Sequence, residues 1–416
     1  MNMQPLRTHG IRRWLLGLSS GLGLAGAVAA QGLLDIGESF IEDFELPFSG
    51  VYSSSLGWDS DAGNRDRGFT GRARRTSDPG ESMIWQNALS LGYGVKLSDR
   101  DSLSFNGNYQ NVFFFDPPPG RDDMDHNLRL GVRYSRQVSQ NLSISDSFYV
   151  SYEMDPNYDV GLTVSRPTSG HFLASNRLSA NYQWSTRFST STGYSFSTVI
   201  YEDNSLDRES YFRHGISQDF RYAFKRQLKG VFTYRTGFTD YDTDDDNGKS
   251  YTHALMAGID WSPKRRFSMT GRVGANLRVY DGELDDRLAP RAELGMNYVV
   301  AKRTSARWLN VLGLDDTGRA GLQSGYSYRT SLSLGHGFTR RLNGNASLNY
   351  VHSDYSDGRN GLEDATEDSF ALQLGMSYFL WRSVSLTGSY SFSLVAEDGM
   401  DDYRRHRVLL GMSYSF

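Results

Sequence analysis

The feature that most constrains this chain is a two-residue alternation of apolar and small polar side chains that recurs along residues 50–416. In residues 83–97 the odd positions are apolar apart from Asn87, and mostly Gln, Ser, Gly and Lys lie between them. Because successive side chains of a strand point to opposite faces, each such segment predicts a strand with one apolar and one polar face. About 18 such segments follow one another, including 142–154, 267–279 and 370–380.

Two kinds of connection alternate between these segments. Short turns such as 139–141 and 340–341 follow one segment, and longer acidic, glycine-rich stretches such as 59–81, 155–169 and 354–367 follow the next. Short turns at one end and long loops at the other are typical of a transmembrane barrel with an even number of strands. The predicted fold class is therefore all-β: an antiparallel up-and-down transmembrane β-barrel of about 18 strands.

Aromatic side chains support a membrane setting. Mean hydropathy is −0.52, and after the amino-terminal region no apolar run is long enough for a spanning helix, yet the chain has 25 Tyr, 23 Phe and 7 Trp. Rings in the apolar phase gather at both ends of the segments, which predicts the two girdles of a membrane barrel. Beside the short turns lie Tyr93, Tyr134, Trp184, Phe188, Phe224, Trp261, Phe267, Tyr298, Phe338 and Tyr378; near the long loops lie Trp85, Phe113, Tyr152, Phe172, Phe212, Phe238 and Tyr251.

A soluble all-β protein is the alternative fold. It would need two or more domains for so many strands, and no linker divides the segments. In lipid, by contrast, unpaired backbone groups at an open sheet edge cost several kcal/mol each, so the sheet must close. The closed barrel is therefore the preferred interpretation.

The amino-terminal region predicts export. Arg7, Arg12 and Arg13 precede an apolar run over 14–28 and a small-residue cleavage site, which together indicate a signal peptide over residues 1–30. A G-x-G-x-x-G match at 21–26 lies inside that apolar run, without the flanking strand and helix of a nucleotide site. We expect a bacterial outer-membrane location with a cleaved signal peptide and a barrel domain over residues 50–416.

Residues 31–49 form a short acidic segment that the barrel does not require. Its apolar residues, including Leu33, Ile36 and Phe40, recur at helical spacing among Asp and Glu, so it predicts a periplasmic amphipathic helix. Alone it would be marginally stable, which leaves three alternatives: a plug in the lumen, a docking helix for a periplasmic partner, or a tether.

The chain ends in the strand RHRVLLGMSYSF, whose apolar and polar sides alternate except at Leu409. We expect this strand to pair with the first strand and close the barrel. Its ending resembles the carboxy-terminal signature of bacterial outer-membrane proteins, which the barrel-assembly machinery recognises. The residues that carry this resemblance, and form the predicted assembly signal, are Leu410, Met412, Tyr414 and Phe416.

A wider resemblance covers residues 385–416. The Tyr-x-Phe strand, acidic loop and Asp-Tyr-Arg before the closing strand resemble the putative beta-barrel porin 2 group, whose members often accompany exopolysaccharide export systems. The resemblance implies a porin-like outer-membrane channel, and we expect it to pass hydrophilic solutes, with anionic solutes as one option, or exopolysaccharide. A structural or adhesive barrel without transport is the first alternative, and an outer-membrane lipid-modifying enzyme is the second.

Arginines dominate the charges expected on the polar face of the strands, against fewer acids such as Asp146, Asp219, Asp260 and Glu293. Either they are free and give a net positive lumen, or they pair with acids on neighbouring strands and brace the wall. Free guanidinium groups would favour anions, including acidic sugars. The lumen-facing candidates are Arg129, Arg133, Arg177, Arg213, Arg221, Arg235, Arg272, Arg278, Arg291, Arg329 and Arg407.

Other chemistry finds little support in the sequence. His352 and Ser353 are adjacent and should point to opposite faces, so only His352 with Asp354 could form part of a catalytic group. The acidic run 240–246 lacks the Gly and Glu of a calcium loop. Cysteine is absent, histidines lack metal spacing, and no cofactor or nucleic acid is expected. Expected partners are outer-membrane lipid with lipopolysaccharide, the barrel-assembly machinery, and a polysaccharide substrate or export partner.

Overall fold

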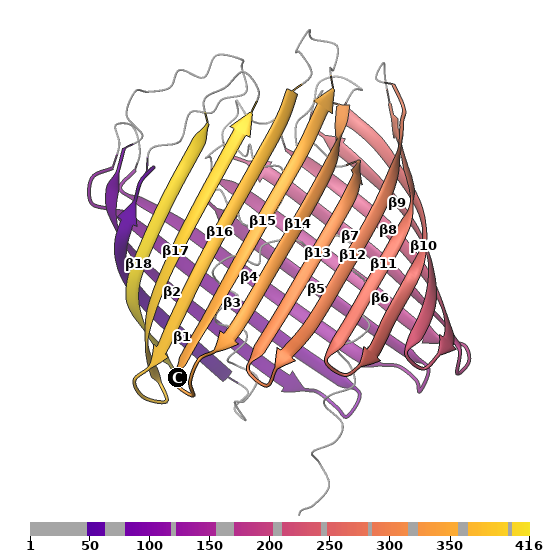
Figure 1. Cartoon of the computed structure of the whole chain (residues 1–416), viewed down its shortest axis with the longest axis horizontal. Helices are drawn as coiled ribbons and strands as arrows, with labels where there is room; N and C mark the ends of the chain where they lie inside the picture. The colour runs from indigo at the N-terminus through magenta and orange to yellow at the C-terminus, as the bar shows by residue number, and fades with distance from the viewer. Residues whose placement is uncertain are drawn as a thin grey trace, which may run out of the picture.

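The computed structural model is a single antiparallel sheet of 18 strands that closes on itself (Figure 1). It describes residues 48–62, 80–117, 122–154, 170–202, 210–242, 248–281, 285–314, 323–356, 365–397 and 402–416. The strands are β1 (Phe48–Asp59), β2 (Ser82–Lys96), β3 (Asp101–Phe114), β4 (Met124–Gln137), β5 (Leu142–Glu153), β6 (His171–Gln183), β7 (Phe188–Tyr201), β8 (Tyr211–Lys225), β9 (Leu228–Tyr241), β10 (Lys249–Lys264), β11 (Phe267–Tyr280), β12 (Arg287–Ala301), β13 (Thr304–Leu314), β14 (Gln323–Gly337), β15 (Leu342–Ser356), β16 (Ala365–Phe379), β17 (Val384–Glu397) and β18 (Tyr403–Ser415). The predicted fold class is confirmed, and the described residues include no helix able to cross a membrane.

Each strand pairs with the next in sequence, and β1 pairs with β18. The predicted short turns at 139–141 and 340–341 are confirmed, and they lie at the barrel end that carries the carboxyl terminus in Figure 1. The longer connections join strands at the opposite end. The predicted signal peptide, most of the 31–49 segment and residues 243–247 of the acidic run lie outside the described residues.

The seam between β1 and β18 runs from Val51 opposite Ser415 to Asp59 opposite Arg407. Below it, the backbone N–H of Gly50 donates to Phe416 and that of Phe416 donates to Gly50, each at 2.9 Å. The Phe416 ring lies over Gly50, where any side chain would collide with it. The last residue therefore takes part in closure. The four residues of the predicted assembly signal all lie in the outward phase and are exposed.

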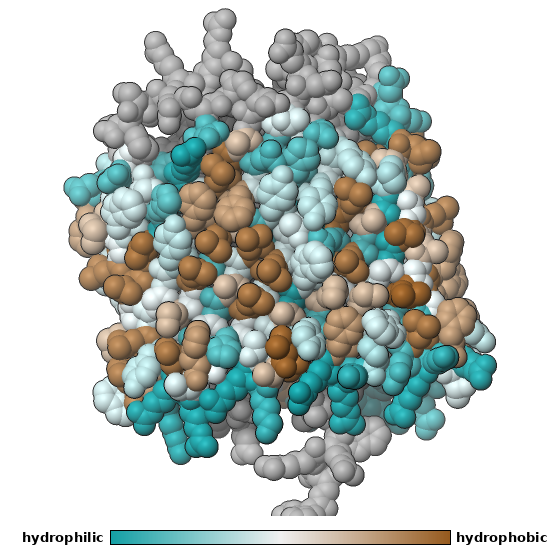
Figure 2. Space-filling view, viewed as in Figure 1, coloured by the Kyte–Doolittle hydropathy of each residue, from teal (hydrophilic) through white to brown (hydrophobic). Residues whose placement is uncertain are grey.

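Large apolar side chains cover the outer face, as the alternation predicts. Figure 2 shows them as a brown zone between polar ends, and many are more than 40% exposed, such as Leu410 at 68% and Phe224 at 61%. In water such a surface would be unfavourable, whereas in a bilayer it contacts acyl chains. Asn87, the break in the alternation of β2, accepts a hydrogen bond from the Tyr52 hydroxyl at 3.0 Å on the same face.

Leu409, the other irregularity, lies on the inner wall for a structural reason. It is 4% exposed and packs in a cluster with Ala62, Ile84, Val112 and Phe114. All but Ala62 are inward-phase residues of β2, β3 and β18, close to the extracellular end of the seam. A small apolar core therefore stabilises the inside of the barrel where it closes.

Candidate functional site

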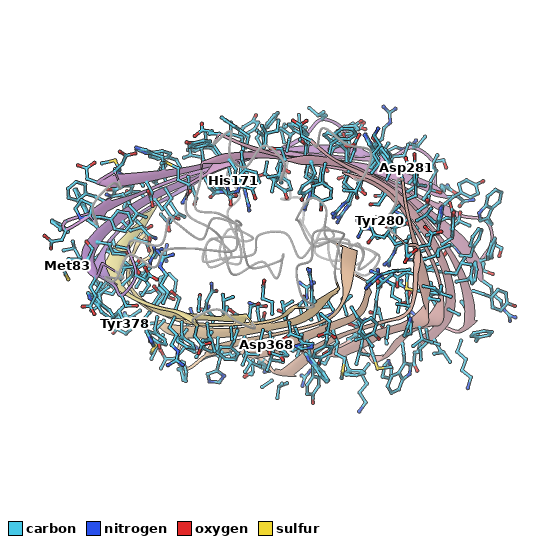
Figure 3. All side chains as sticks on the ribbon, turned by 90° about the horizontal axis from the view of Figure 1, so that it is seen from above. Met83, His171, Tyr280, Asp281, Asp368 and Tyr378 are labelled. Carbon is cyan, nitrogen blue, oxygen red and sulfur yellow. The ribbon has the colours of Figure 1, made fainter. Side chains whose placement is uncertain are left out.

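The inner wall contains two chemically different sectors. Strands β8 to β12 present the densest group of inward-facing charges, while β5 to β7 and β14 to β17 present mainly Ser, Thr, Asn and Gln. Seen along the axis in Figure 3, the strands enclose an oval, with Met83 and Tyr378 on the outside and His171 on the inside. Eighteen strands make a barrel too wide for its own inward side chains to fill, so these sectors line a lumen.

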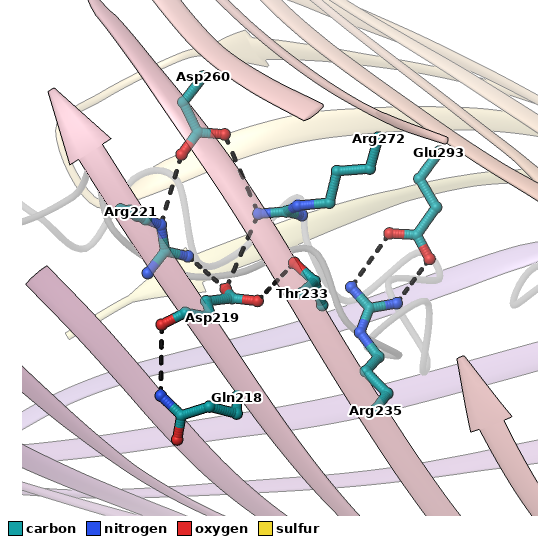
Figure 4. Close-up of polar contacts among 8 residues, drawn as sticks. All are labelled: Gln218, Asp219, Arg221, Thr233, Arg235, Asp260, Arg272 and Glu293. Atoms are coloured by element: carbon teal, nitrogen blue, oxygen red, sulfur yellow. Dashed lines mark hydrogen bonds and ion pairs between the residues drawn. The ribbon is translucent and has the colours of Figure 1, made fainter. Parts of the chain in front are cut away.

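The first charged cluster is centred on Asp219 of β8 (Figure 4). Its carboxylate accepts hydrogen bonds from Arg221 and, at 2.7 Å, from the Thr233 hydroxyl, and Arg272 lies 3.8 Å away. Asp260 of β10 joins the same two arginines at 3.4 and 4.0 Å. The Arg272 side chain is only 3% exposed. These guanidinium groups are therefore neutralised within the wall.

The second cluster is centred on Glu293 of β12, whose side chain is 7% exposed. Arg235 reaches it from β9 and donates two hydrogen bonds, at 2.6 and 3.1 Å, while Arg291 donates from two positions along the same strand. A two-fold bond of this kind is the favoured geometry for guanidinium and carboxylate. Because Arg235 spans two intervening strands to reach Glu293, the cluster ties β9 to β12 across the inner wall.

The third cluster closes the seam. Asp59 of β1 is fully buried and accepts hydrogen bonds from Arg405 and Arg407 of β18, the shortest being 2.7 Å from each. Arg405 was not among the predicted lumen residues, although it shares the inward phase of Arg407. The alternation alone would have found it. The role of Asp59 as their shared acceptor could not be predicted from the sequence, because it depends on the register in which β18 pairs with β1.

Three more predicted arginines are held by neighbours on the wall. Arg129 pairs with Glu153 at 3.2 Å, Arg213 donates to the Thr239 hydroxyl at 3.1 Å, and Arg278 donates to Ser250 at 2.9 Å. Each also lies over a tyrosine ring 5.3 to 5.5 Å away, which adds a cation–π contact. Arg177 of β6 and Arg329 of β14 lie in the inward phase and are partly buried.

Arg133 differs from all of these. It is exposed in the inward phase of β4, toward the short-turn end, and no hydrogen bond or ion pair involves it within the described part of the chain. Arg307 of β13, which the prediction omitted, has the same exposure, phase and lack of partners among the described residues. These cations remain available to a solute.

The short-turn end of the barrel is strongly basic, and Figure 2 shows it as a polar band. The described rim at the opposite end is mainly acidic, with Asp116, Asp123, Glu202, Asp242 and Asp354 exposed. Among the described residues, the two ends of the barrel therefore differ in the sign of their charge. The exposed basic residues at or beside the short turns are Lys96, Arg100, Arg136, Arg187, Lys225, Arg226, Lys264, Arg265, Arg266, Lys302, Arg303, Arg340, Arg341 and Arg382.

One predicted inward acid is in the wrong place. Asp146 stands opposite Tyr134 and Leu178 in the outward phase of β5, where it accepts a hydrogen bond from Asn176 at 2.9 Å. The prediction was wrong because Asp146 has the same parity as the apolar residues Leu142 and Phe148 of its own strand. Paired with an amide, a carboxylate can lie in the outward phase.

The groups considered for other chemistry are not assembled into sites. His352 faces outward between Asp368 and Asp354, at 2.9 and 3.2 Å, while Ser353 is buried on the inner side. His352 and Ser353 therefore do not form a nucleophile and base. In the described ranges no group of three or more His, Cys, Asp or Glu could hold a metal ion.

Comparison with known proteins is consistent with this architecture. The model of the putative beta-barrel porin 2 family matches residues 278–416, from β11 to the last strand. The chain is also similar to OccAB4 of Acinetobacter baumannii, with 12% identity over 89% of this chain and 98% of that one and a TM-score of 0.43. It is similar as well to the outer membrane protein opdK of Pseudomonas aeruginosa, with 11% identity over 89% of this chain and 98% of that one and a TM-score of 0.46. A search of curated proteins gave no match.

The fold and the family match together define the class of this protein. It is a closed antiparallel β-barrel of 18 strands, and the putative beta-barrel porin 2 family model matches its carboxy-terminal third. The resemblance to the putative beta-barrel porin 2 group, first seen in residues 385–416, is confirmed for the carboxy-terminal third of the chain.

Proposed function

We propose that this barrel is a channel that favours anionic hydrophilic solutes, with an acidic exopolysaccharide as its specific substrate. The observation that carries the proposal is the basic mouth at the short-turn end, continued into the lumen by Arg133 and Arg307, which are exposed and whose side chains have no partner among the described residues. Short turns face the periplasm in outer-membrane barrels, so an anion leaving the cell would meet this mouth first. Like-charged residues around an entrance raise the local concentration of the opposite ion.

The uncharged sectors of the lumen support a sugar polymer as substrate. Inward positions of β17 are Ser385, Thr387, Ser389, Ser391 and Ser393, and the facing rows of β15 and β16 add Asn and Gln. Hydroxyl and amide groups exchange hydrogen bonds with sugar hydroxyls without holding one position strongly. A carbohydrate chain could therefore slide along this surface while its acidic groups are attracted by the mouth.

Planar-bilayer recordings test the proposal and separate it from a structural or adhesive barrel. Purified protein should give discrete conductance steps, and an acidic oligosaccharide on the periplasmic side should block them at a lower concentration than a neutral one of equal length. Absence of conductance would favour the structural or adhesive barrel. Equal block by both oligosaccharides would support a channel but contradict the proposal that its substrate is acidic.

A further inference from the structure

Four histidines on the outer surface repeat one arrangement. His126, His214, His253 and His406 are each the third to fifth residue of a strand that begins at the extracellular end. Each Nδ1 lies 2.8 to 3.1 Å from a tyrosine hydroxyl of the preceding strand. The tyrosines are Tyr109, Tyr194, Tyr234 and Tyr390, in the same order. We call these eight residues the histidine belt.

The register shows that the arrangement is the same in all four places. Each tyrosine stands directly opposite an aliphatic residue, which follows the histidine by two positions: Leu128, Ile216, Leu255 and Val408. The ring centroids of each pair are 6.1 to 6.4 Å apart. The same arrangement therefore recurs near the long-loop end of four strand pairs, β3–β4, β7–β8, β9–β10 and β17–β18.

The belt leaves one polar atom of each imidazole without a protein partner. We assign the tyrosine hydroxyl as the donor to Nδ1, and with this assignment the neutral ring carries its proton on Nε2. No hydrogen bond to Nε2 is formed within the described residues at these four histidines. A polar N–H facing lipid is costly unless it finds an acceptor, and the lipid is what this face contacts.

We propose that the histidine belt binds the phosphate groups of the phosphorylated glycolipid in the outer leaflet. The long loops mark the extracellular side, so the belt faces that leaflet near its head groups. An imidazole N–H donates a hydrogen bond to a phosphate oxygen, and a hydrogen bond to a charged acceptor is stronger than one to a neutral acceptor. Lys249 and Arg404 lie in the same outward phase above His253 and His406; Lys249 stands opposite Asp240, and Arg404 is paired with Asp402 at 3.0 Å, so the imidazoles are the donors on which the proposal depends.

Two other outward histidines define the limits of the belt. His352 lies at the same end but is held between the carboxylates of Asp368 and Asp354, which would repel phosphate. His336 lies at the periplasmic end and contacts the Thr304 hydroxyl at 2.8 Å rather than a tyrosine. His336 is therefore the matched control, since it has the same side chain and phase in the opposite leaflet.

Native mass spectrometry of the full barrel with added lipid A tests the proposal. The belt variant carries His126→Phe, His214→Phe, His253→Phe and His406→Phe, and the control carries His336→Phe. We expect the belt variant to bind lipid A about ten-fold more weakly per site, since a hydrogen bond to a charged group is lost at each. The control should bind like the wild type. Dephosphorylated lipid A should bind the wild type as weakly as lipid A binds the belt variant.

Two results would overturn the proposal: a belt variant that binds lipid A like the wild type, or a wild type that binds dephosphorylated lipid A as tightly as lipid A. A second variant guards against misfolding. It keeps every aromatic ring and histidine but removes the hydroxyls that orient the imidazoles, through the substitutions Tyr109→Phe, Tyr194→Phe, Tyr234→Phe and Tyr390→Phe. This variant should also bind lipid A more weakly, and unchanged binding would count against the belt.

Discussion

The guanidinium groups of the middle wall and those of the periplasmic mouth are chemically identical but have opposite surroundings. Arg272 is buried beside Asp219 and Arg235 is largely buried beside Glu293, whereas Arg133 and Arg307 are exposed and their side chains have no partner among the described residues. Burial makes a paired charge necessary, because an unpaired one is costly in the wall. The comparison shows that arginines of the middle wall are held by carboxylates, whereas those at the mouth are exposed, as the proposed attraction of anions requires.

Removal of the Glu293 carboxylate should lower the stability of the barrel more than any other change considered. Glu293→Ala leaves the partly buried Arg235 and Arg291 without their carboxylate, which we expect to cost about 3 kcal/mol of unfolding free energy. Urea titration of the refolded barrel, followed by tryptophan fluorescence, measures it. Arg133→Ala is the control and should change stability by less than about 0.5 kcal/mol. An equal loss of unfolding free energy in both variants would contradict the distinction between structural arginines in the middle wall and non-structural arginines at the mouth.

The seam cluster should show the next largest effect. Asp59→Asn keeps the shape of the side chain but removes the charge that Arg405 and Arg407 share, for an expected loss of about 2 kcal/mol. Adding Arg405→Gln should recover part of the loss, because fewer buried cations then lack a carboxylate. The same urea titration checks both steps. Additive losses in the double variant would argue against a shared cluster.

Charge reversal at the mouth should change ion selectivity rather than stability. Arg133→Glu with Arg307→Glu should lower the anion-to-cation permeability ratio about five-fold, since one charge a few ångströms away in water changes an ion's energy by about 1 kcal/mol. Stability should stay near that of the wild type. Reversal potentials in a salt gradient report the ratio. Arg404→Glu, exposed and outward at the far rim, serves as control, and an equal shift there would refute a local role for the mouth.

The smallest expected effect concerns the acidic segment before β1. We propose that residues 31–49 are drawn to the basic mouth beside which β1 starts, and that they narrow the lumen there. Deletion of residues 32–45 should leave assembly intact, because every strand and the closing signal remain. Single-channel conductance should rise. Unchanged conductance and unchanged blocking noise would instead leave the segment as a tether or a docking helix.

The strands and their two faces could be predicted from the sequence because the alternation that marks them involves only a few consecutive residues. Alternation in each strand determines its two faces, and the eleven candidate arginines and the residues of both girdles could be assigned to a face from parity alone. Asp146 shows that residue type is a poorer guide than parity, since the outward phase of its own strand includes it. A period of two residues is a property of a few consecutive residues, so it needs no knowledge of the fold.

Partner choice could not be predicted, because it depends on register between strands. Whether Arg235 was free or braced was decided by Glu293 three strands away, and Asp59 gained its role only when β18 closed on β1. The histidine belt was missed for the same reason. Each of its histidines looked isolated in sequence, and only the pairing of adjacent strands placed a tyrosine hydroxyl beside it.

The sign of the wild-type reversal potential tests the central claim most directly. Purified barrel in a planar bilayer, with low salt on both sides and a several-fold gradient of KCl, should show a potential that reports preference for chloride. The preference should weaken toward 1 M salt, where the Debye length falls to about 3 Å and the mouth charges are screened. Preference for potassium at low salt would contradict a channel whose basic mouth selects anions.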